Sequence, residues 1–459
     1  MAEINCTTKP AFWVRLGGAK VYRSIMDTHV TNRGSAPYPQ VPPYLERDPT
    51  PRDQAIYVPS VGPGFAKHVY EGKWARPLPN GLTPRDLNFL DPNTQLLRLS
   101  HVMSSAGQAL NQNKPCIITQ RNRAHTFLIG DSGGYQIASG LLKINGNQDR
   151  LRILRWLEKH SDVAMTLDVP TGPLLKPGYS FTSFKDCLTT TLDHLDFFQK
   201  NREEGKIKFL NVLQGNNTQQ AKTWYQAVKN YPFEGWAFAG VMRHNFYYLC
   251  QRIIEMADEN KLQDKAWIHV LGTNEIETAV LLTALQRAIN QYINPNLRIS
   301  FDTSSPFRLL AWNTFYTIPR FDKNRMVMGT ARIPDDLAYI GSTLRWPWPS
   351  KLGNRLTLGD VCVSNDVYSR NSIDVQSHYY INHHNLGALC YGIALANRVF
   401  DSESLIHQHS IATTAGAGVE AINEVIKQGR LSALDRYKTT FSNLRHGALP
   451  ASDDDDRQL

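Results

Sequence analysis

The chain has 459 residues, of which 42% are hydrophobic and 20% charged, the composition of a globular protein large enough for one elaborated domain or two. No apolar run reaches the roughly 18 to 20 residues that span a bilayer, and no basic stretch followed by an apolar one opens the chain, so we expect neither a membrane protein nor a secreted one. The formal net charge of +9 favours a polyanionic partner without naming it. Six cysteines without paired spacing indicate reduced thiols and a cytoplasmic protein.

Residues 1 to about 95 are rich in proline and predict an irregular N-terminal extension. Eight prolines fall between Pro37 and Pro63, which argues against long helices and central strands there. The segment is too apolar for a linker, so we expect it to lie as an extended segment on the main domain.

From about residue 96 to 400 short apolar runs alternate with helical periodicity. The strand-like runs are Cys116–Thr119, Thr126–Ile129, Val163–Leu167, Lys208–Leu213, Gly235–Ala239, Trp267–Leu271, Arg298–Phe301 and Arg325–Met328. The clearest helix is Glu275–Ile289, with Asn274 as its predicted cap. Eight strands alternating with helices predict a (β/α)8 TIM barrel in the α/β class. An open doubly wound sheet is the alternative, but no Gly-x-Gly-x-x-Gly motif or phosphate-loop lysine supports it.

The remaining residues predict additions to this barrel. We expect an inserted subdomain around residues 340–385. Residues 401–459 predict a helical C-terminal part, with helices at Leu405–Val425 and Leu431–Leu444 and a solvated acidic tail at Asp453–Asp456.

Polar residues and glycines follow most of the predicted barrel strands. They are Asp131, Asp168, Gln214, Gly240, Gly272 and Asp302. The active sites of such barrels lie at the C-terminal ends of the strands, so we expect these residues to converge. Arg121 and Arg123 precede a strand, which places them near the opposite end, where we expect them to be solvated.

Several motifs in this order resemble those of the tRNA-guanine transglycosylases. The segment Asp131-Ser-Gly-Gly-Tyr-Gln136 resembles that family's Asp-Ser-Gly-Gly-Phe-Gln signature, and Phe301-Asp-Thr-Ser-Ser-Pro-Phe-Arg308 its nucleophile motif. Further segments similar to family motifs are Thr166–Asp168, Val212–Gly215, Ala237–Val241 and Leu271–Thr273. The resemblance covers residues 96 to 400 and implies an enzyme that exchanges guanine in a nucleic acid for a 7-deazaguanine base.

The resemblance also implies roles for individual residues. Asp302 would be the nucleophile that attacks C1′ of the nucleotide, and Asp131 the general acid and base. The residues implied in binding the base are Asp168, Gln214, Gly240, Ser132, Tyr135, Val241 and His269. Two successive displacements retain the configuration, as in retaining glycosidases.

The family's structural zinc site is incomplete in this chain. The resemblance places Asp360, Cys362 and Asn365 at the cysteine positions and His384 at the histidine position. A single cysteine does not make that site, and asparagine is a poor substitute ligand. We expect no cofactor to be required for the chemistry, with zinc as an open possibility and ordinary packing of the subdomain as the alternative.

Other departures from the family pattern favour DNA over tRNA. In the motif after Pro306 this chain has one arginine, Arg308, whereas tRNA-modifying members have a second one three residues later. Asn245 stands where queuosine enzymes have a glutamate. In these features the chain resembles the branch of the family, found in bacteria and their viruses, that inserts 7-deazaguanines into DNA. The resemblance suggests 7-cyano-7-deazaguanine as the incoming base. The residues implied in nucleic-acid binding are Arg308, Arg243, Arg345, Trp346, Trp348 and Lys351; packing is the alternative for the tryptophans.

The hypothesis is therefore a DNA-guanine transglycosylase acting in the cytoplasm of a bacterial or virus-infected cell. A tRNA-guanine transglycosylase without zinc is the second candidate, and an inactive nucleic-acid-binding partner subunit the third. A homodimer or a helper protein remains open.

Overall fold

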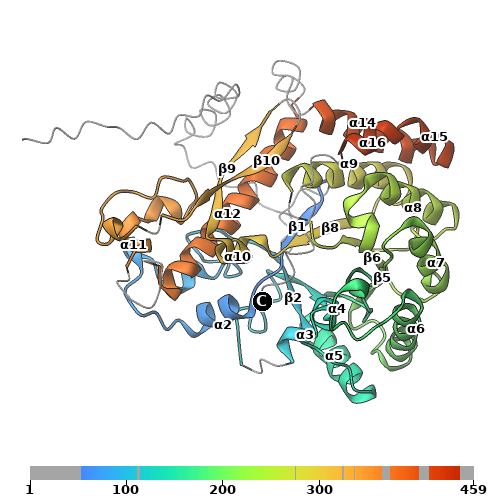
Figure 1. The fold of residues 1–459 in the computed structure, drawn as a ribbon, viewed down its shortest axis with the longest axis horizontal. Helices are drawn as coiled ribbons and strands as arrows, with labels where there is room; N and C mark the ends of the chain where they lie inside the picture. The colour runs from blue at the N-terminus through green and yellow to red at the C-terminus, as the bar shows by residue number, and fades with distance from the viewer. Residues whose placement is uncertain are drawn as a thin grey trace, which may run out of the picture.

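Eight parallel strands surround the centre of the protein in the computed structural model, which describes residues 53–110, 114–273, 275–322, 325–334, 336–363, 373–402 and 413–444 (Figure 1). The strands are β1 (Ile56–Pro59), β2 (His101–Ser105), β3 (Phe127–Asp131), β4 (Val163–Met165), β5 (Lys208–Leu213), β6 (Gly235–Phe238), β7 (Trp267–Val270) and β8 (Arg298–Thr303). They follow the order β1-β8-β7-β6-β5-β4-β3-β2, and a parallel bridge from Ser60 to Met103 joins the two end strands. The predicted (β/α)8 barrel is confirmed.

Two of the predicted barrel strands are wrong. Cys116–Thr119 lies in a turn, and Arg325–Met328 overlaps β10 (Met326–Arg332), which pairs antiparallel with β9 (Thr314–Phe321) in a hairpin outside the barrel. The missing barrel strands are β1, inside the segment predicted to be an irregular extension, and β2. Four residues of β1 become a strand because they pair with β8 on one side and reach β2 on the other.

Helices cover the outside of the barrel and continue beyond it. They are α2 (Pro63–Glu71), α3 (Ala106–Ala109), α4 (Gly134–Ala138), α5 (Asn147–His160), α6 (Phe184–Asn201), α7 (Thr218–Val228), α8 (Phe246–Asp258), α9 (Ile276–Tyr292), α10 (Ser305–Arg308), α11 (Leu358–Val361), α12 (Val375–Phe400), α14 (Thr413–Gln428), α15 (Leu431–Arg436) and α16 (Lys438–Leu444). The short 3-10 helices are η2 (Pro79–Gly81), η3 (Pro84–Leu87), η4 (Gly172–Leu175), η5 (Gly240–His244), η6 (Leu309–Trp312), η7 (Leu337–Tyr339) and η8 (Gly353–Arg355).

The strongest helix predictions agree with this arrangement. The predicted helix Glu275–Ile289 corresponds to α9, although its predicted cap, Asn274, lies outside the described residues. The predicted helix Leu405–Val425 overlaps α14 from Thr413 onward, and its residues 405–412 lie outside the described part of the chain. The predicted helix Leu431–Leu444 corresponds to α15 and α16, and all three helices lie against α8 and α9 (Figure 1). Within the described ranges, no helix has the length and apolar character needed to cross a membrane.

Most of the barrel interior is filled with apolar side chains. Its buried residues are Ile56, Val58, Met103, Ile129, Val163, Met165, Leu210, Val212, Ala237, Ala239 and Trp267. On β7 and β8 polar residues take inward positions, because side chains alternate between the two faces of a strand. Ile299 and Phe301 point to the core beneath the helices, whereas Ser300 and Asp302 alternate with them.

A second core joins the N-terminal segment to the region after β8. Residues from Val61 to Ile118 pack with residues from Phe315 to Leu386 in one buried cluster. Arg76 fastens the two parts: Nη1 donates to Asp374 at 2.8 Å and Nη2 to the Asp360 carbonyl at 2.7 Å. The predicted extension and the predicted inserted subdomain therefore share one core.

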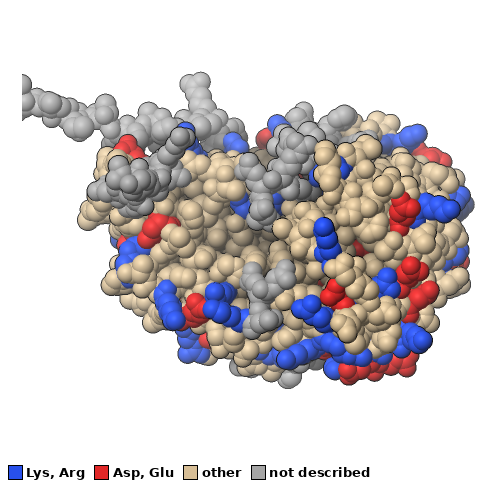
Figure 2. All heavy atoms as spheres, turned by 60° about the horizontal axis from the view of Figure 1, so that its bottom comes forward, with Lys and Arg blue, Asp and Glu red and all other residues tan. Residues whose placement is uncertain are grey.

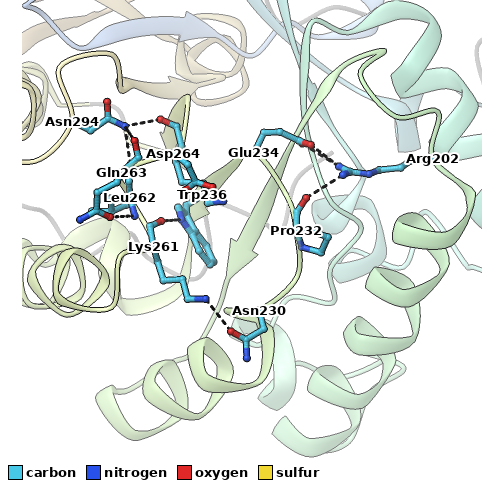
Figure 3. A network of polar contacts seen from close by, with 11 residues as sticks. Arg202, Asn230, Pro232, Glu234, Trp236, Lys261, Leu262, Gln263, Asp264 and Asn294 are labelled. Carbon is cyan, nitrogen blue, oxygen red and sulfur yellow. Dashed lines mark hydrogen bonds and ion pairs between the residues drawn. The ribbon is translucent and has the colours of Figure 1, made fainter.

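A network of polar contacts holds the N-terminal ends of β6, β7 and β8 (Figure 3). Asn294 Nδ2 donates to the carbonyls of Leu262 and Lys265 at 2.8 and 2.9 Å. Arg202 donates to both carboxylate oxygens of Glu234 at 2.9 and 3.1 Å, and Trp236 Nε1 donates to the Lys261 carbonyl at 3.0 Å. These contacts satisfy backbone groups that the strand ladders leave unpaired.

A second ion-pair group lies at the same end, beneath β3 and β4. Asp162 accepts from Arg121 at 2.9 Å and from Arg123 at 3.1 Å, and also from the Leu128 N–H at 2.9 Å. The Arg121 side chain is only 2% exposed. The expectation that Arg121 is solvated is therefore wrong, since its charge is paired inside the protein.

Candidate active site

Three carboxylates lie at the C-terminal ends of barrel strands, two on the neighbouring strands β3 and β4 and one on β8. Asp131 is the last residue of β3, Asp168 follows β4 by three residues, and Asp302 lies near the end of β8. The charge of Asp302 acts on Asp131, and that of Asp131 acts on Asp168. Within the described part of the chain, no lysine or arginine forms an ion pair with any of the three. Backbone N–H groups, an amide and an imidazole hold these carboxylates instead.

Asp302 is bound through one of its two oxygens. His269 Nε2 lies 3.2 Å from Oδ1, and the Gly272 N–H donates to Oδ1 at 2.7 Å. Gly272 has φ +64, and a Cβ there would lie 2.9 Å from Arg243 Nη1. Glycine therefore allows the backbone to approach Asp302 while the Arg243 guanidinium lies against it.

Asp131 accepts neutral hydrogen bonds in a largely buried position. The Gly133 N–H donates to Oδ1 at 3.2 Å. Ser105, the register partner of Asp131 on β2, donates its hydroxyl hydrogen to Gln136 Oε1 at 2.7 Å. Burial raises the pKa of the Asp131 carboxyl above its usual range; the Gly133 N–H and the Ser105 hydroxyl act in the opposite direction, and the Asp302 charge adds to the rise. A carboxyl of this kind holds a proton more readily than an exposed one.

Asp168 is paired with the amide of Gln214. Gln214 Nε2 donates to Asp168 Oδ2 at 2.7 Å, and both side chains are buried. Burial raises the pKa of Asp168 to about 7, although the bond from Gln214 lowers it and the Asp131 charge raises it further. A Cβ on Gly134 would lie 3.2 Å from Asp168 Oδ1, so the glycine lets the loop after β3 lie close to this carboxylate.

The other residues predicted to bind a base occupy different positions around these carboxylates. Ser132 is fully buried and donates to the Thr166 carbonyl at 3.0 Å, so its hydroxyl ties β3 to the end of β4. Tyr135 is half-buried on α4. Gly240, with φ +56, and Val241 begin η5 after β6, and the Val241 N–H donates to the Gly215 carbonyl at 2.9 Å.

His269 does not fit its predicted place in a base-binding set. Its ring is fully buried, and both nitrogens already have partners: Nε2 faces Asp302, and Nδ1 lies 2.7 Å from Ser300 Oγ. The ring therefore contacts Asp302 and Ser300 inside the barrel.

The tryptophans predicted to contact nucleic acid lie in the second core instead. Trp346 is buried, and its ring centroid lies 5.0 Å from Phe315 and 5.2 Å from Trp348. Lys351 Nζ donates to the Leu96 carbonyl at 3.1 Å. Packing, the alternative, is what the structure supports for Trp346, and Trp348 contacts the same Phe315 ring at 4.5 Å.

The predicted cationic residues differ in their closeness to the carboxylates. Arg243 lies against Gly272, and Arg308, on α10 directly after β8, lies over the Trp312 ring at 5.7 Å. Arg345 is exposed at an isolated bridge to Thr357. On the face shown in Figure 2, side chains of both charges are interspersed around the edge and do not form one basic patch.

The residues aligned with the zinc ligands do not fit a metal site. Asp360 Oδ2 accepts from Thr357 at the start of α11, and the Cys362 thiol donates to the Pro334 carbonyl at 2.7 Å. Both ring nitrogens of His384 are engaged, with Ser350 at 2.8 Å and the Tyr316 carbonyl at 2.9 Å. Among the described residues no three His, Cys, Asp or Glu side chains form a group that could hold a metal, and Asn365 lies outside them.

Sequence reasoning missed the polar residues that support the carboxylates. Ser105 is the register partner of Asp131 on β2, a strand that was not predicted. Trp267 and Ser300 are bonded at 2.6 Å inside the barrel. The signal was the alternation Trp267-x-His269 and Ser300-x-Asp302, which places all four side chains on the inward face once the strands are known.

No family model matches this chain, and no curated protein matches it.

Proposed function

We propose that the protein exchanges guanine in DNA for a 7-deazaguanine base through a covalent bond to Asp302. The observation that carries the proposal is the pair of carboxylates at the ends of β3 and β8. Asp302 is held by neutral donors on one oxygen, and the neighbouring Asp131 has a raised pKa. A nucleophilic carboxylate beside a protonated one is the arrangement that retaining glycosyl transfer uses.

In the first displacement Asp302 attacks C1′ of the nucleotide. The new bond joins a carboxylate oxygen to C1′, the C1′–N9 bond breaks, and its electron pair leaves with guanine. The proton that neutralises the departing base comes from Asp131, whose raised pKa suits a general acid. The flat base leaves, and the sugar stays on the enzyme.

In the second displacement the incoming base attacks the same carbon. Its N9 forms the bond to C1′, the bond to Asp302 breaks, and Asp131 takes the proton that N9 loses. Both residues return to their starting states, so no cofactor enters the balance. Two inversions retain the configuration.

Asp168 and Gln214 suit the recognition of guanine. A carboxylate accepts from two neighbouring donors, such as N1–H and the 2-amino group, and an amide N–H donates to an oxygen such as O6. The two side chains meet at 2.7 Å in the structure, so binding would exchange this mutual bond for bonds to the base.

The sequence features favour DNA as the polymer. The target nucleotide must leave its stack for C1′ to reach Asp302. Arg243, which lies against Gly272, and Arg308, on α10 directly after β8, are the cations we assign to its phosphates. The motif order supports membership of the guanine transglycosylases, and the lone Arg308 and Asn245 favour the DNA branch over the tRNA one.

Labelled guanine tests the proposal directly. The purified protein is incubated with the label and, separately, with duplex DNA, single-stranded DNA and unmodified tRNA, with Asp302→Asn as the inactive variant and Asp264→Asn, an exposed aspartate, as the matched control. We expect label in DNA with the wild type and the control, and none with Asp302→Asn.

The other outcomes identify the alternatives. Label in tRNA alone would retain the chemistry and assign the tRNA-modifying role. Label in no polymer, together with binding of DNA in a gel-shift assay, would contradict exchange and favour an inactive binding subunit.

A further inference from the structure

A chain of hydrogen bonds runs up the barrel interior and ends on the nucleophile of the proposed reaction. Trp267 Nε1 donates to Ser300 Oγ at 2.6 Å, Ser300 Oγ lies 2.7 Å from His269 Nδ1, and His269 Nε2 lies 3.2 Å from Asp302 Oδ1. Ser300 and His269 are fully buried, and Trp267 is nearly so. Strands β7 and β8 supply the members alternately, so their pairing sets the spacing of the chain.

The direction of each bond follows from what the groups can do. The indole N–H can only donate, so Ser300 Oγ accepts from it and keeps its own hydrogen to donate. The carboxylate Oδ1 only accepts, so His269 Nε2 carries a proton. An unprotonated Nδ1 accepts the hydrogen that Ser300 keeps, so every N–H and O–H of this hydrogen-bond network has an acceptor. The network therefore favours a neutral imidazole with its proton on Nε2.

We propose that His269 is a positioning residue for Asp302, held in one tautomer by Ser300 and Trp267. This inference rests on the proposed function, because it concerns the same nucleophile. His269 Nε2–H and the Gly272 N–H both bind Oδ1, and within the described residues no donor binds Oδ2. Oδ2 is the oxygen that attacks C1′, and His269 gives up no proton in either displacement.

A neutral donor suits this position better than a cation. A lysine or arginine paired with Asp302 would stabilise its charge strongly and weaken it as a nucleophile, whereas an N–H of a neutral ring fixes the rotamer with a smaller effect on charge. The serine and the indole keep the ring from turning, because rotation would break two buried hydrogen bonds.

A graded series of variants tests the chain by its effect on kcat and KM in the exchange reaction. His269→Leu removes the donor, and we expect kcat to fall about 100-fold, the effect of a misplaced reacting group. His269→Gln keeps an N–H near Nε2 and should stay within about 10-fold of the wild type. In Ser300→Ala kcat should fall about 10-fold, because Ser300 acts on Asp302 through His269. In Trp267→Phe kcat should fall less, because Trp267 acts through both Ser300 and His269.

The split between the two constants separates positioning from base binding. Positioning predicts a lower kcat with KM for the base nearly unchanged in all four variants. A raised KM with kcat unchanged in His269→Leu would return His269 to the base-binding set. His383→Leu, a buried histidine of the second core, is the control for packing damage; an equal loss of kcat there would also overturn the proposal.

Nitrogen-15 spectra of histidine-labelled protein test the tautomer without any turnover. The His269 signals, assigned by their loss in His269→Gln, should show one protonated and one unprotonated ring nitrogen. Two protonated nitrogens would overturn the assigned network. If the spectra agree but the wild type labels none of the three polymers, it is the proposed function that fails, and the positioning role falls with it.

Discussion

The two ends of the barrel use charged side chains in opposite ways. At the N-terminal end Asp162 is paired with Arg121 and Arg123, and Glu234 with Arg202, so each carboxylate has a cation within hydrogen-bonding distance. At the C-terminal end Asp131, Asp168 and Asp302 gather without such a partner among the described residues, and neutral groups hold them.

The difference separates stability from chemistry. A buried carboxylate paired with a guanidinium is stabilised as an anion and is unreactive, whereas one held by neutral donors keeps a raised pKa or an available lone pair. We therefore expect the protein to lose stability when a carboxylate charge is removed at the N-terminal end of the barrel. Removal of a carboxylate charge at the C-terminal end should instead raise the free energy of unfolding. Five predictions test this comparison.

The largest expected effect is on activity at the C-terminal end. Asp131→Asn removes the proposed acid and base, and we expect the proposed exchange to slow about 10²- to 10⁴-fold. The free energy of unfolding should not fall, because a buried charge without a cation is removed. Rates with labelled guanine and urea unfolding measure the two effects; a loss of stability that matches the loss of activity would contradict the separation.

The largest expected effect on stability lies at the opposite end. Asp162→Asn leaves the buried Arg121 guanidinium without its counter-charge, and the free energy of unfolding should fall by about 3 kcal/mol. Urea unfolding measures the loss, and Asp264→Asn, whose side chain is 71% exposed, is the control with little change. Equal stability of the two variants would show that this ion pair contributes nothing.

Asp168→Asn should stabilise the protein while it disables the site. Asparagine keeps an oxygen for the bond from Gln214 and removes the cost of burying a charge, so we expect a gain of roughly 2 kcal/mol at pH 8. Exchange of guanine should be lost with it, because an amide cannot accept both donors of the base. An unchanged or lower free energy of unfolding in Asp168→Asn would mean that the buried charge of Asp168 does not destabilise the folded protein.

The same residue predicts a pH dependence of stability. The pKa of Asp168 is about 7 in the folded protein and about 4 in an unfolded chain. Between these values the unfolded state releases the proton and the folded state keeps it, so this contribution to stability is present below about pH 4 and is lost as the pH rises through about 7. Unfolding of wild type and Asp168→Asn from pH 4 to 8 should show their difference growing with pH; a constant difference would refute this origin.

The smallest effect concerns one neutral bond in the network of Figure 3. Trp236→Phe keeps the ring in the core and removes the donor to the Lys261 carbonyl, so we expect a loss of about 1 kcal/mol and no change in kcat. Thermal or urea unfolding detects it. A change in kcat here would show that the two ends of the barrel are coupled.

The sequence was sufficient for the parts of the fold with local patterns. The strand-like run of β5 (Lys208–Leu213) and the apolar stripe of α9 identified both elements to within three residues. The strand β1 lies in a proline-rich segment, and its four residues are a strand only because β8 lies beside them. Cys116–Thr119 has strand-like residues but no partner strand, so it forms a turn in the second core. Pairing over long sequence distances decided these cases.

The candidate site divides in the same way. The carboxylates were predictable because each directly follows an apolar run. Residues that follow a barrel strand lie at the face where such barrels have their active sites. The supporting groups were not, because Ser105 belongs to an unpredicted strand and Ser300 looks like a strand residue without a role. Trp346 was predicted to bind nucleic acid because basic and aromatic residues surround it in the sequence. Its packing on Phe315 and His384 shows that it belongs to a core.

The pairing of β1 with β8 has a consequence for how the protein is made. Val58 lies in register with Asp302. During synthesis β1 therefore leaves the ribosome almost 250 residues before β8, and the two strands pair only after β8 has been made. Contacts of this kind slow folding, because a long loop is ordered before they form. A nascent chain that stops before β8 lacks one strand of the barrel and lacks Asp302. Closure of the barrel and arrival of Asp302 are one event, so a partly made chain is without the proposed nucleophile.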